Sequence, residues 1–577
     1  MGTPSPQVMD VTTLLAVVND LRGRVLPSRF EKAQQPDSQT LQLGFRTLQG
    51  MVWLELSWRA DCPRLVQIPP PPRNGSGSTL AQQSQHSLRQ LALVEMEQEG
   101  FERVVRFGFA SRPGNPVQRH LVLELMGRHS NLLLLDERNR VIALGRQVRG
   151  HQSRVRPIGT GDDYVPPPPL QSSPPQKDED FARWRKRLTL LPVPLAKALP
   201  QAYQGISPAL ARQLASDDPS AIHSLLNTPV QEIDQRQWEQ LHERWQQWLH
   251  CLDEASFSLH ISTATNSYRV WGATSMPLAA STQKEPPLSL TLGCYYSDQL
   301  QARELERQSE ELRQQLLQAR RREEELLLDQ ITKMQATDSA AELQQQADGL
   351  LCLPAPSRDQ IDQAQKLYRR ARKLRRAVPQ LEERQRHHRQ RLALIDGSEA
   401  FLEEVLSAGW DCPRQRLERL NELRLEAQEL LTSQRRRGRR QGAPRPALQP
   451  QPLELCSPAG LTIQVGRNHR QNDWISLRHA KPGDLWFHAQ ECPGSHVVLK
   501  ASTGLADEAD LTLAADLAAL FSRARGNRRV AVVMVPVEQL QRIVGAGPGT
   551  VRHRGGAVRW AEPERAERQL QAGELLA

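Results

Sequence analysis

The residues best suited to chemistry lie near the carboxyl end of the chain, where aromatic and imidazole side chains alternate with small residues. They occur in two short segments, Asp484-Leu-Trp-Phe-His488 and Pro493-Gly-Ser-His496. The rings of Trp486, His488 and His496 offer stacking faces and hydrogen-bond donors suited to unpaired nucleotides. We therefore expect an RNA-binding site made of Asp484, Trp486, His488, Gly494, Ser495 and His496.

The same segments leave a metal site as an alternative. Asp484, His488 and His496 are side chains of types that bind transition metals. Two histidines and one aspartate on separate strands, without supporting cysteines, are more often a hydrogen-bonded polar cluster. We therefore expect no metal and no cofactor, and we expect Gly494 to permit a tight turn.

A second group of candidate residues is cationic. The segment from Arg369 to Arg376 has six cations and no acid. Charge runs are usually solvated faces of a helix, but this run exceeds what the flanks of a heptad repeat need. A further basic run spans Arg435–Arg440. We expect phosphate contacts from Arg369, Arg370, Arg372, Lys373, Arg375 and Arg376, as in an arm that binds nucleic acid.

Composition favours a polyanionic partner and several structural modules. The chain has 577 residues and a formal net charge of +10, with only 5% aromatic residues. Its seven cysteines contain no Cys-x-x-Cys pair, so neither a disulfide framework nor a structural zinc is indicated. No apolar run reaches the roughly 18 to 20 residues of a membrane span, and no signal peptide is apparent. We expect a cytoplasmic protein without a membrane partner.

The amino-terminal part, residues 1–170, has the mixed periodicity of an α+β domain. A helix is expected from Val11, and another from Gln82 to Glu99 that ends at Gly100. Alternating apolar runs predict the strands Thr40–Phe45, Met51–Leu56, Glu102–Phe109, Val117–Leu125, Asn131–Asp136 and Val141–Leu144.

Helical periodicity follows in residues 180–250, where Gly205 and Ser207-Pro208 predict a tight turn into a new helix. This pattern is typical of a helix-hairpin-helix unit, which can present backbone N–H groups to phosphate, or of a plain helical spacer. Residues 251–296 are expected to form a connector with a pair of short strands, at Phe257–Val270 and Leu288–Gly293.

Residues 297–440 carry heptad spacing in separate blocks. Leu305, Leu312, Ala319 and Leu326 recur every seven residues, and so do Leu367, Leu374 and Leu381. The period is lost over Met334–Pro356, so we predict an antiparallel coiled-coil hairpin with a helical cap at about 335–410. A linker at 441–452, a second α+β domain at 453–565 and a tail at 566–577 complete the chain. In that domain we expect a helix at Asp507–Arg525 and strands at Leu461–Val465, Leu485–His488, His496–Leu499 and Val530–Val535.

Three motifs resemble those of one protein family. Val465-Gly-Arg-Asn468, Gln471-Asn-Asp473 and the two segments quoted first resemble the NFACT-R domain. Leu123–Asp136 resembles the NFACT-N signature, and Gln365–Arg370 resembles the middle of the family's coiled coil. The resemblance covers nearly the whole chain in the family's order of NFACT-N, helix-hairpin-helix, coiled coil and NFACT-R. It therefore implies a multidomain α+β protein of the RqcH/NEMF family.

The resemblance also implies a function. Such proteins bind large ribosomal subunits carrying peptidyl-tRNA, recruit alanyl-tRNA and promote untemplated C-terminal alanine tailing, which marks the product for degradation. The implied partners are the large subunit with its rRNA, these tRNAs and an RqcP-like small RNA-binding protein, but not DNA. The protein is then a positioning factor and not an enzyme, with peptidyl transfer left to the ribosome.

The family's tRNA-binding residues correspond to four positions: Glu102, where the family usually has Asp, Arg103, Glu124 and Arg128. We expect these to lie at adjoining strand ends and to act as one tRNA-facing cluster. The alternative for Glu124 and Arg128 is a local ion pair that orients the turn at Gly127.

Two other classes of function are weighed against this one. The amino-terminal signature and the hairpin also resemble formamidopyrimidine DNA glycosylases, but the start Met1-Gly-Thr-Pro4 lacks the amino-terminal proline nucleophile. A fibronectin-binding surface adhesin is the other class. An adhesin is expected to have a signal peptide, an anchor and repeats, none of which is apparent here. Adhesion to fibronectin also does not account for the arginine clusters.

Overall fold

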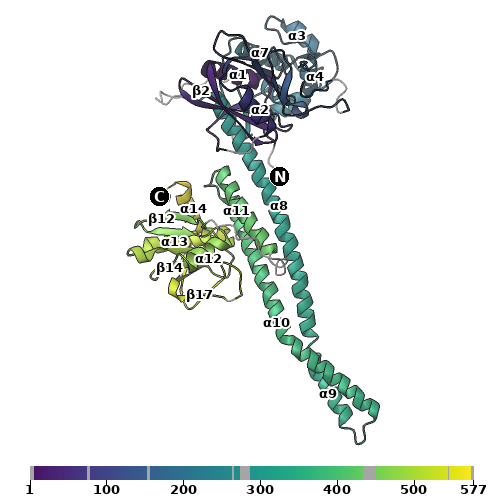
Figure 1. Cartoon of the computed structure of the whole chain (residues 1–577), viewed down its shortest axis with the longest axis vertical. Helices are drawn as coiled ribbons and strands as arrows, with labels where there is room; N and C mark the ends of the chain where they lie inside the picture. Colours follow the sequence, from purple (N-terminus) through teal and green to yellow (C-terminus); the bar gives the residue numbers. More distant parts are fainter. Residues whose placement is uncertain are drawn as a thin grey trace. The chain divides into compact units, whose positions relative to one another are not determined.

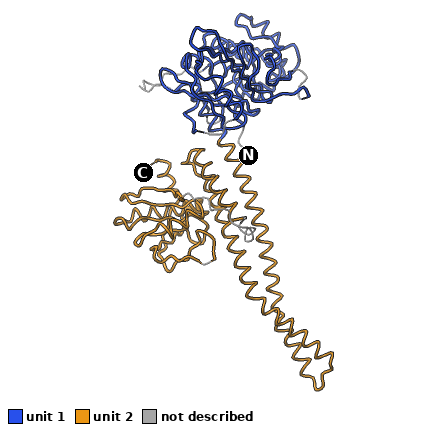
Figure 2. The backbone as a smooth tube through the Cα atoms, in the orientation of Figure 1, with its two compact units in different colours: residues 1, 3–300 blue, residues 2, 301–577 orange. Residues whose placement is uncertain are grey.

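The computed structural model describes residues 5–73, 78–151, 156–262, 265–272, 286–432, 449–543 and 545–573. The chain divides into two compact units, one ending at Leu300 and one beginning at Gln301 (Figure 2). The basic run Arg435–Arg440, most of the linker, the Pro4 position and the end of the tail lie outside the described residues. No helix within the described ranges is long and apolar enough to cross a membrane.

The first unit contains a nine-stranded antiparallel sheet in the order β4-β3-β2-β1-β5-β6-β7-β8-β9. Apolar side chains of α1, among them Leu14, Val17 and Leu21, pack against one face of this sheet. The elements are α1 (Val11–Val25), β1 (Ser28–Asp37), β2 (Thr40–Thr47), β3 (Gly50–Ser57), β4 (Arg64–Ile68), α2 (Thr79–Ser87), β5 (Ala92–Gln98), β6 (Val104–Ala110), β7 (Arg119–Glu124), β8 (Asn131–Leu135) and β9 (Val141–Leu144) (Figure 1).

The helix predicted for Gln82–Glu99 is wrong in its second half. The helix α2 ends at Ser87, and Ala92–Gln98 forms β5, which pairs with both β1 and β6. Leu93 and Met96 are buried in the sheet core, so tertiary pairing overrides the helical propensity of this segment. Gly100 has φ +52° in the connection between β5 and β6, where it permits a turn rather than ending a helix.

Five helices in the same unit pack around a tryptophan core that includes Trp184, Trp238, Trp245 and Trp248. They are α3 (Phe181–Leu188), α4 (Leu195–Ala202), α5 (Pro208–Ala215), α6 (Pro219–Asn227) and α7 (Gln235–Asp253). The predicted hairpin turn between α4 and α5 is confirmed. Gly205 has φ +77°, the Ser207 hydroxyl accepts the Leu210 N–H at 2.9 Å, and Pro208 is the first residue of α5.

The strand pair predicted in the connector is wrong as a pairing. The first predicted strand, Phe257–Val270, instead contains two short strands, β10 (His260–Ser262) and β11 (Ser267–Arg269), which pair with each other. Residues 288–293 are not a strand, because they form the first turns of the long helix α8 (Leu288–Gln335). Buried Leu292 and Tyr296 of α8 belong to the core beneath the nine-stranded sheet, which explains their apolar character.

The second unit contains the predicted antiparallel coiled-coil hairpin. The helices α8 and α10 (Arg358–Ser407) run in opposite directions, because Gln330 contacts Gln385 while the earlier Glu323 contacts the later Arg391. Buried Leu305, Leu312 and Leu316 pack with residues of α10 and of α11 (Pro413–Thr432). The cap is smaller than predicted: α9 (Ser339–Leu351) packs on the first part of α10, which continues unbroken to Ser407.

The C-terminal domain is built on a six-stranded antiparallel sheet in the order β12-β13-β15-β14-β16-β19. Helix α13 packs on one face, and α12 with the β17–β18 hairpin packs on the other. The predicted helix Asp507–Arg525 is shorter, since α13 ends at Leu520 and a 3-10 turn follows at Arg523–Gly526. The elements are β12 (Leu453–Cys456), β13 (Thr462–Val465), α12 (His469–Leu477), β14 (Leu485–Ala489), β15 (Val497–Leu499), α13 (Glu508–Leu520), β16 (Val530–Pro536), β17 (Leu540–Arg542), β18 (Val551–His553), β19 (Ala557–Ala561) and α14 (Pro563–Gln571).

Candidate nucleic-acid interface

The four candidate residues of the first unit lie near two adjoining strand ends. Glu102 and Arg103 directly precede β6, Glu124 ends β7, and Arg128 lies in the short turn that follows. Val104 is paired with Glu124, and the Leu125 N–H donates to the Arg103 carbonyl oxygen at 2.9 Å. The backbone placement predicted from the sequence is therefore confirmed.

The side chains, however, do not form one cluster. Because successive side chains of a strand point to opposite faces, Arg103 and Glu124 lie on different sides of the sheet. Arg103 lines a cleft together with Val11 of α1. Glu124 lies on the other face, beside Tyr164. The predicted single cluster is thus divided into two sites.

Glu124 is a buried structural carboxylate in this arrangement. The guanidinium of Arg156 donates to its two oxygens at 2.6 and 2.8 Å, and the Tyr164 hydroxyl donates at 3.0 Å. Burial alone would lower the pKa of Arg156, but the hydrogen bond and charge of Glu124 raise it above its usual value. The alternative of a Glu124–Arg128 ion pair is wrong, since the partner is Arg156. The sequence carries no spacing signal for this partner.

Arg128 is exposed in the 3-10 turn Gly127–His129. Its Nε donates to Nε2 of His129 at 3.1 Å, and its carbonyl oxygen accepts from Arg146 at 2.5 Å. Its guanidinium makes no ion pair with any described residue. It is therefore free to meet an external anion, on a different surface from Arg103.

Arg103 lines a cleft of about 290 Å³ between the amino-terminal domain and the turn that joins α4 to α5. Burial lowers the pKa of Arg103 below the usual arginine value, and the nearby carboxylates of Asp10 and Glu102 offset only part of this effect. Within the described ranges the guanidinium forms neither an ion pair nor a hydrogen bond. A half-buried cation without a partner is costly, and an anionic ligand would remove that cost.

The two carboxylates beside Arg103 already have partners. Asp10 caps α1 by accepting the Thr13 N–H at 2.9 Å, and its other oxygen accepts from the Ser207 hydroxyl at 2.7 Å. Glu102 accepts the Leu170 N–H at 3.2 Å. These contacts hold the two carboxylates in place. The Arg103 guanidinium remains the unpaired charge in the cleft.

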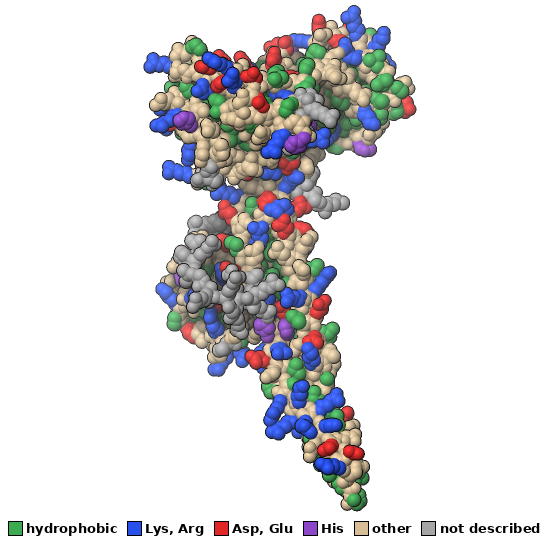
Figure 3. Space-filling model, turned by 45° about the vertical axis from the view of Figure 1, so that its right-hand side comes forward, with side chains coloured by type: hydrophobic (Ala, Val, Ile, Leu, Met, Phe, Trp, Pro, Cys, Tyr) green, Lys and Arg blue, Asp and Glu red, His purple; other side chains and the backbone are tan. Residues whose placement is uncertain are grey.

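The cationic segment of α10 is fully available to solvent. All six predicted phosphate-binding side chains are exposed, and none of them forms an ion pair within the part of the chain that is described. Arg369 donates to the Gln365 carbonyl at 3.3 Å, and Arg375 donates to Gln344 of α9. Lys and Arg side chains gather along this helical arm (Figure 3). The six residues are Arg369, Arg370, Arg372, Lys373, Arg375 and Arg376.

The C-terminal candidates are, by contrast, mostly core residues. Trp486 is only 2% exposed and packs with Ile475 and Val498. His496 is also buried, and its Nδ1 is 2.8 Å from the Ser476 hydroxyl. Neither ring offers a free stacking face, so the stacking interpretation of these two residues is not supported by the geometry.

His488 is the partly exposed member of this group. Its ring stacks on Trp486 at 5.6 Å between centroids and meets the His496 ring edge-on at 5.3 Å. Burial lowers the pKa of His488 to about 4 and that of His496 well below its usual value, so both rings are neutral at pH 7. Among the described residues, no group of three or more His, Cys, Asp or Glu side chains is arranged to hold a metal ion.

Asp484 is completely buried and organises a loop. Its carboxylate accepts from the Lys500 ammonium at 3.1 Å, from the Ser502 hydroxyl at 2.6 Å and from the Lys481 N–H at 2.9 Å. Burial alone would raise the pKa of Asp484, but these hydrogen bonds lower it below the usual value. Its role in this arrangement is structural.

Gly494 and Ser495 also serve close packing. A Cβ atom on Gly494 would lie 2.8 Å from the Ser522 Cβ, so glycine is required by a close approach and not by the predicted tight turn. The Ser495 N–H donates to the Phe521 carbonyl at 2.8 Å, and its hydroxyl is buried. Both residues join the loop before β15 to the end of α13.

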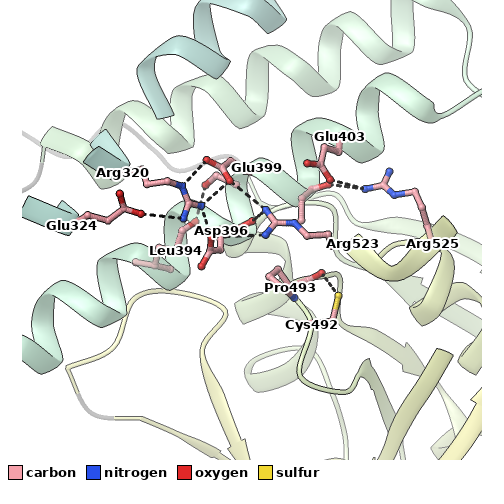
Figure 4. A network of polar contacts seen from close by, with 12 residues as sticks. Arg320, Glu324, Leu394, Asp396, Glu399, Glu403, Cys492, Pro493, Arg523 and Arg525 are labelled. Atoms are coloured by element: carbon pink, nitrogen blue, oxygen red, sulfur yellow. Dashed lines mark hydrogen bonds and ion pairs between the residues drawn. The ribbon is translucent and has the colours of Figure 1, made fainter. Parts of the chain in front are cut away.

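The C-terminal domain contacts the coiled coil through arginines of the turn after α13. Arg523 donates to the Asp396 carbonyl at 3.1 Å and to Glu399 at 3.3 Å, and Arg525 donates to the Ala400 carbonyl at 3.0 Å. The carboxylates of Asp396 and Glu399 also pair with Arg320 of α8 (Figure 4). Arg523 and Arg525 are engaged in these internal contacts, so they are poor candidates for binding phosphate.

Comparison with known proteins identifies the modules. Residues 10–355 match the family described as NFACT N-terminal and middle domains, and residues 454–555 match the NFACT protein RNA binding domain. The chain is 27% identical over 579 residues to the Rqc2 homolog RqcH of Streptococcus pneumoniae serotype 2 (strain D39), covering 93% of this chain and 95% of that one. It is 25% identical over 492 residues to the Rqc2 homolog RqcH of Bacillus subtilis (strain 168), covering 80% and 81%.

A solved structure gives a further match. The C-terminal part of the fibronectin/fibrinogen-binding protein from Streptococcus suis is 25% identical, with a TM-score of 0.37, and covers 46% of this chain and 97% of that one.

The fold and the two family matches define a multidomain α+β protein with an amino-terminal NFACT domain, a coiled-coil arm and a C-terminal RNA-binding domain. The chain belongs to the NFACT proteins of the RqcH/NEMF family. Membership of this family supports a role in ribosome quality control and in RNA binding.

Proposed function

We propose that this protein binds large ribosomal subunits obstructed by peptidyl-tRNA, recruits alanyl-tRNA and promotes untemplated addition of alanine to the C-terminus of the trapped chain. The tail marks the product for degradation. The observation that carries the proposal is the unpaired guanidinium of Arg103, held in a cleft of about 290 Å³. That volume lies near the lower end for small-ligand pockets, so it suits one nucleotide or the aminoacyl end of a tRNA rather than a duplex.

The chemistry of the cleft matches that end of a tRNA. Arg103 supplies several donors for a phosphate, and the turn at Gly205 brings backbone close to the same space. Asp10 lines the cleft, and Glu102 holds Leu170 in its wall. The carboxylate of Asp10 can accept from a ribose hydroxyl or from the α-ammonium group of an aminoacyl ester. Arg128, on its separate exposed turn, contacts the tRNA at a second point.

The remaining parts hold the ribosome. The exposed cations from Arg369 to Arg376 bind phosphates of ribosomal RNA, and a small RNA-binding protein of the RqcP type strengthens this attachment. In this proposal the protein catalyses no bond formation itself. It positions the tRNA, and ribosomal RNA performs peptidyl transfer.

The proposal is tested by purifying the tagged full chain from cells and sequencing the bound RNA. We expect large-subunit rRNA and one enriched tRNA species that accepts alanine, and mass spectrometry of stalled products should find C-terminal alanine tails. Arg103→Ala should keep the rRNA and lose the tRNA. Recovery of fibronectin binding with no enriched tRNA would overturn the proposal and favour the adhesin class.

A further inference from the structure

The C-terminal sheet has an exposed face that the candidate residues do not use. We propose that Trp560, with the cations around it, binds single-stranded RNA by stacking on an unpaired base. This inference rests on the RNA-binding role proposed above and deepens it by naming a site. The matched RNA-binding family ends at residue 555, so Trp560 lies beyond the region that the family describes.

Strand pairing places Trp560 on the face opposite α13. On the edge strand β19, Trp560 is paired with Ala531 and Val558 with Val533, and Val533 is paired in turn with His488 of β14. Side chains of paired residues share a face of the sheet, and alternate residues along a strand do so as well. A row therefore runs from His488 through Val533 and Val558 to the sheet edge at Trp560.

Exposure on this face is greatest on the edge strand. Trp486 and Val533 on the inner strands are 2% and 7% exposed, whereas Val558 and Trp560 on β19 are 52% and 68% exposed. A tryptophan exposed to this degree buries little of its own surface and leaves its ring free for a partner. The free stacking surface expected of Trp486 thus belongs to Trp560.

Cations border the row. The β17–β18 hairpin lies against the same face, since the His553 ring is 6.1 Å from the Trp486 ring and a Cβ on Gly556 would lie 2.9 Å from Val533 Cγ2. Arg552 and Arg554 on this hairpin are exposed and form no ion pair with any described residue.

The other end of the row is also basic. Arg528 and Arg529 precede β16 and are exposed. Arg529 pairs with Glu562, two residues after Trp560, at 3.4 Å, whereas Arg528 forms no ion pair with any described residue. Unpaired positive charge around an exposed ring matches a phosphate backbone with accessible bases.

Single-stranded RNA fits this surface better than a duplex or an apolar protein partner. A duplex hides the faces of its bases, so it cannot use an isolated tryptophan. A protein partner that required this patch would bury Val558 and Trp560 together but would not need the flanking arginines. Base stacking on an aromatic ring requires no base sequence, so we expect little sequence preference.

The test uses the full chain and an oligouridylate of about 12 nucleotides containing 4-thiouridine as the probe, within the usual range of single-strand site sizes. Arg369, Arg370 and Arg372 are first changed to Gln, so that the arm does not obscure the site. We expect Trp560→Ala to weaken binding about fivefold to a hundredfold, and Trp560→Phe to restore most of it. Photocrosslinks are expected within residues 551–561.

Two matched controls keep the outcome interpretable. Leu505→Ala removes another exposed apolar side chain, at 98% exposure, and should leave affinity unchanged. Arg552→Gln with Arg554→Gln should lower the salt slope of log affinity by about 0.7 for each phosphate that is no longer neutralised, whereas Arg568→Gln on α14, which packs against α13, should not.

Unchanged affinity in Trp560→Ala, or crosslinks confined to other segments, would overturn the proposal. So would an equal loss of affinity in Leu505→Ala, or a Trp560 variant that binds RNA normally but no longer binds a protein partner. The proposed role at the ribosome is judged separately, by co-sedimentation of the unaltered chain with large subunits. That role can stand when the Trp560 site fails.

Discussion

Glu124 and Arg156 form a bidentate ion pair, with N–O distances of 2.6 and 2.8 Å, on the face of the nine-stranded sheet that also holds Tyr164. Glu124 is 1% exposed, so the pair anchors the segment around Arg156 to the end of β7. A residue that resembles a family tRNA contact is here also a structural group. Glu124 and its neighbour Arg128 are therefore expected to differ, with Glu124 contributing to stability and Arg128 to binding.

Glu124→Gln should destabilise the first unit by about 3 kcal/mol, because it leaves Arg156 without its charged partner. Arg128→Ala, at an exposed position, should change stability by less than about 0.5 kcal/mol. Denaturant unfolding of both variants measures the difference. Equal stability of Glu124→Gln and the parent would contradict the structural role.

Arg103→Ala should reduce tRNA occupancy at least tenfold, since one charge-assisted contact contributes about 1.5 to 3 kcal/mol. Association with large subunits should persist, and C-terminal tails should disappear in a reconstituted system. Arg112→Ala, an exposed arginine in the loop after β6, is the control and should behave like the parent. Tailing at the parental rate in Arg103→Ala would exclude a role for the cleft.

The same assay tests Arg128 and Glu102 separately. Arg128→Ala should also lower tRNA recovery, because its guanidinium is exposed and forms no ion pair among the described residues. Glu102→Asp, which introduces the residue usual in the family, should retain or raise tailing. A reduced recovery in Arg103→Ala alone would restrict the tRNA contact to the cleft.

Changing Arg369 and Arg372 to Gln should weaken ribosome association and lower the salt slope of log affinity by about 0.7 to 0.9 for each phosphate that is no longer neutralised. The matched control changes Arg313 and Arg414, which are also exposed on the coiled coil but are paired with Glu310 and Glu418. A salt titration of subunit binding compares the two. Identical slopes would mean that the arm is only a spacer.

Trp486→Ala should destabilise the C-terminal domain by about 3 to 5 kcal/mol, because it removes a large buried ring. RNA binding should then fall only in proportion to the unfolded fraction, as shown by a melting curve recorded beside the binding isotherm. A specific loss of affinity in fully folded Trp486→Ala would restore the stacking interpretation of this residue.

Acidification should destabilise the C-terminal domain. Burial lowers the pKa of His469 and His488 to about 4, so the unfolded chain binds protons near pH 6.5 that the folded domain does not bind. Each neutral ring therefore contributes about 3 kcal/mol to the free energy of unfolding above pH 6.5. This contribution is lost as the pH falls towards 4. Glu426 acts in the opposite direction, because burial raises its pKa to about 7. Its contribution to the free energy of unfolding therefore falls as the pH rises towards 7.

Unfolding midpoints at about pH 7.5 and about pH 5, on either side of the ordinary histidine pKa, measure this effect, and His469→Gln should reduce the difference between them. A difference unaffected by His469→Gln would show that the buried ring does not set the pH response.

The sequence by itself determined the order of the modules and most regular elements. The seven-residue spacing from Leu305 to Leu326 required a long helix with an apolar seam, and Gly205 with Ser207-Pro208 required a turn into a helix, because such signals are local. It also located the exposed cations of α10, since their run contains no acid to pair with. It failed at Gln82–Glu99, where pairing with distant strands decided the conformation.

Only the tertiary structure decided which candidate side chains are accessible. Trp486 and Trp560 are indistinguishable as residue types, but one is enclosed by Ile475 and Val498 while the other lies on an edge strand. Arg103 and Glu124 lie at adjoining strand ends, yet the pleat directs their side chains to opposite faces of the sheet. Partners such as Arg156 come from distant parts of the chain, and packing, which no local pattern encodes, brings them together.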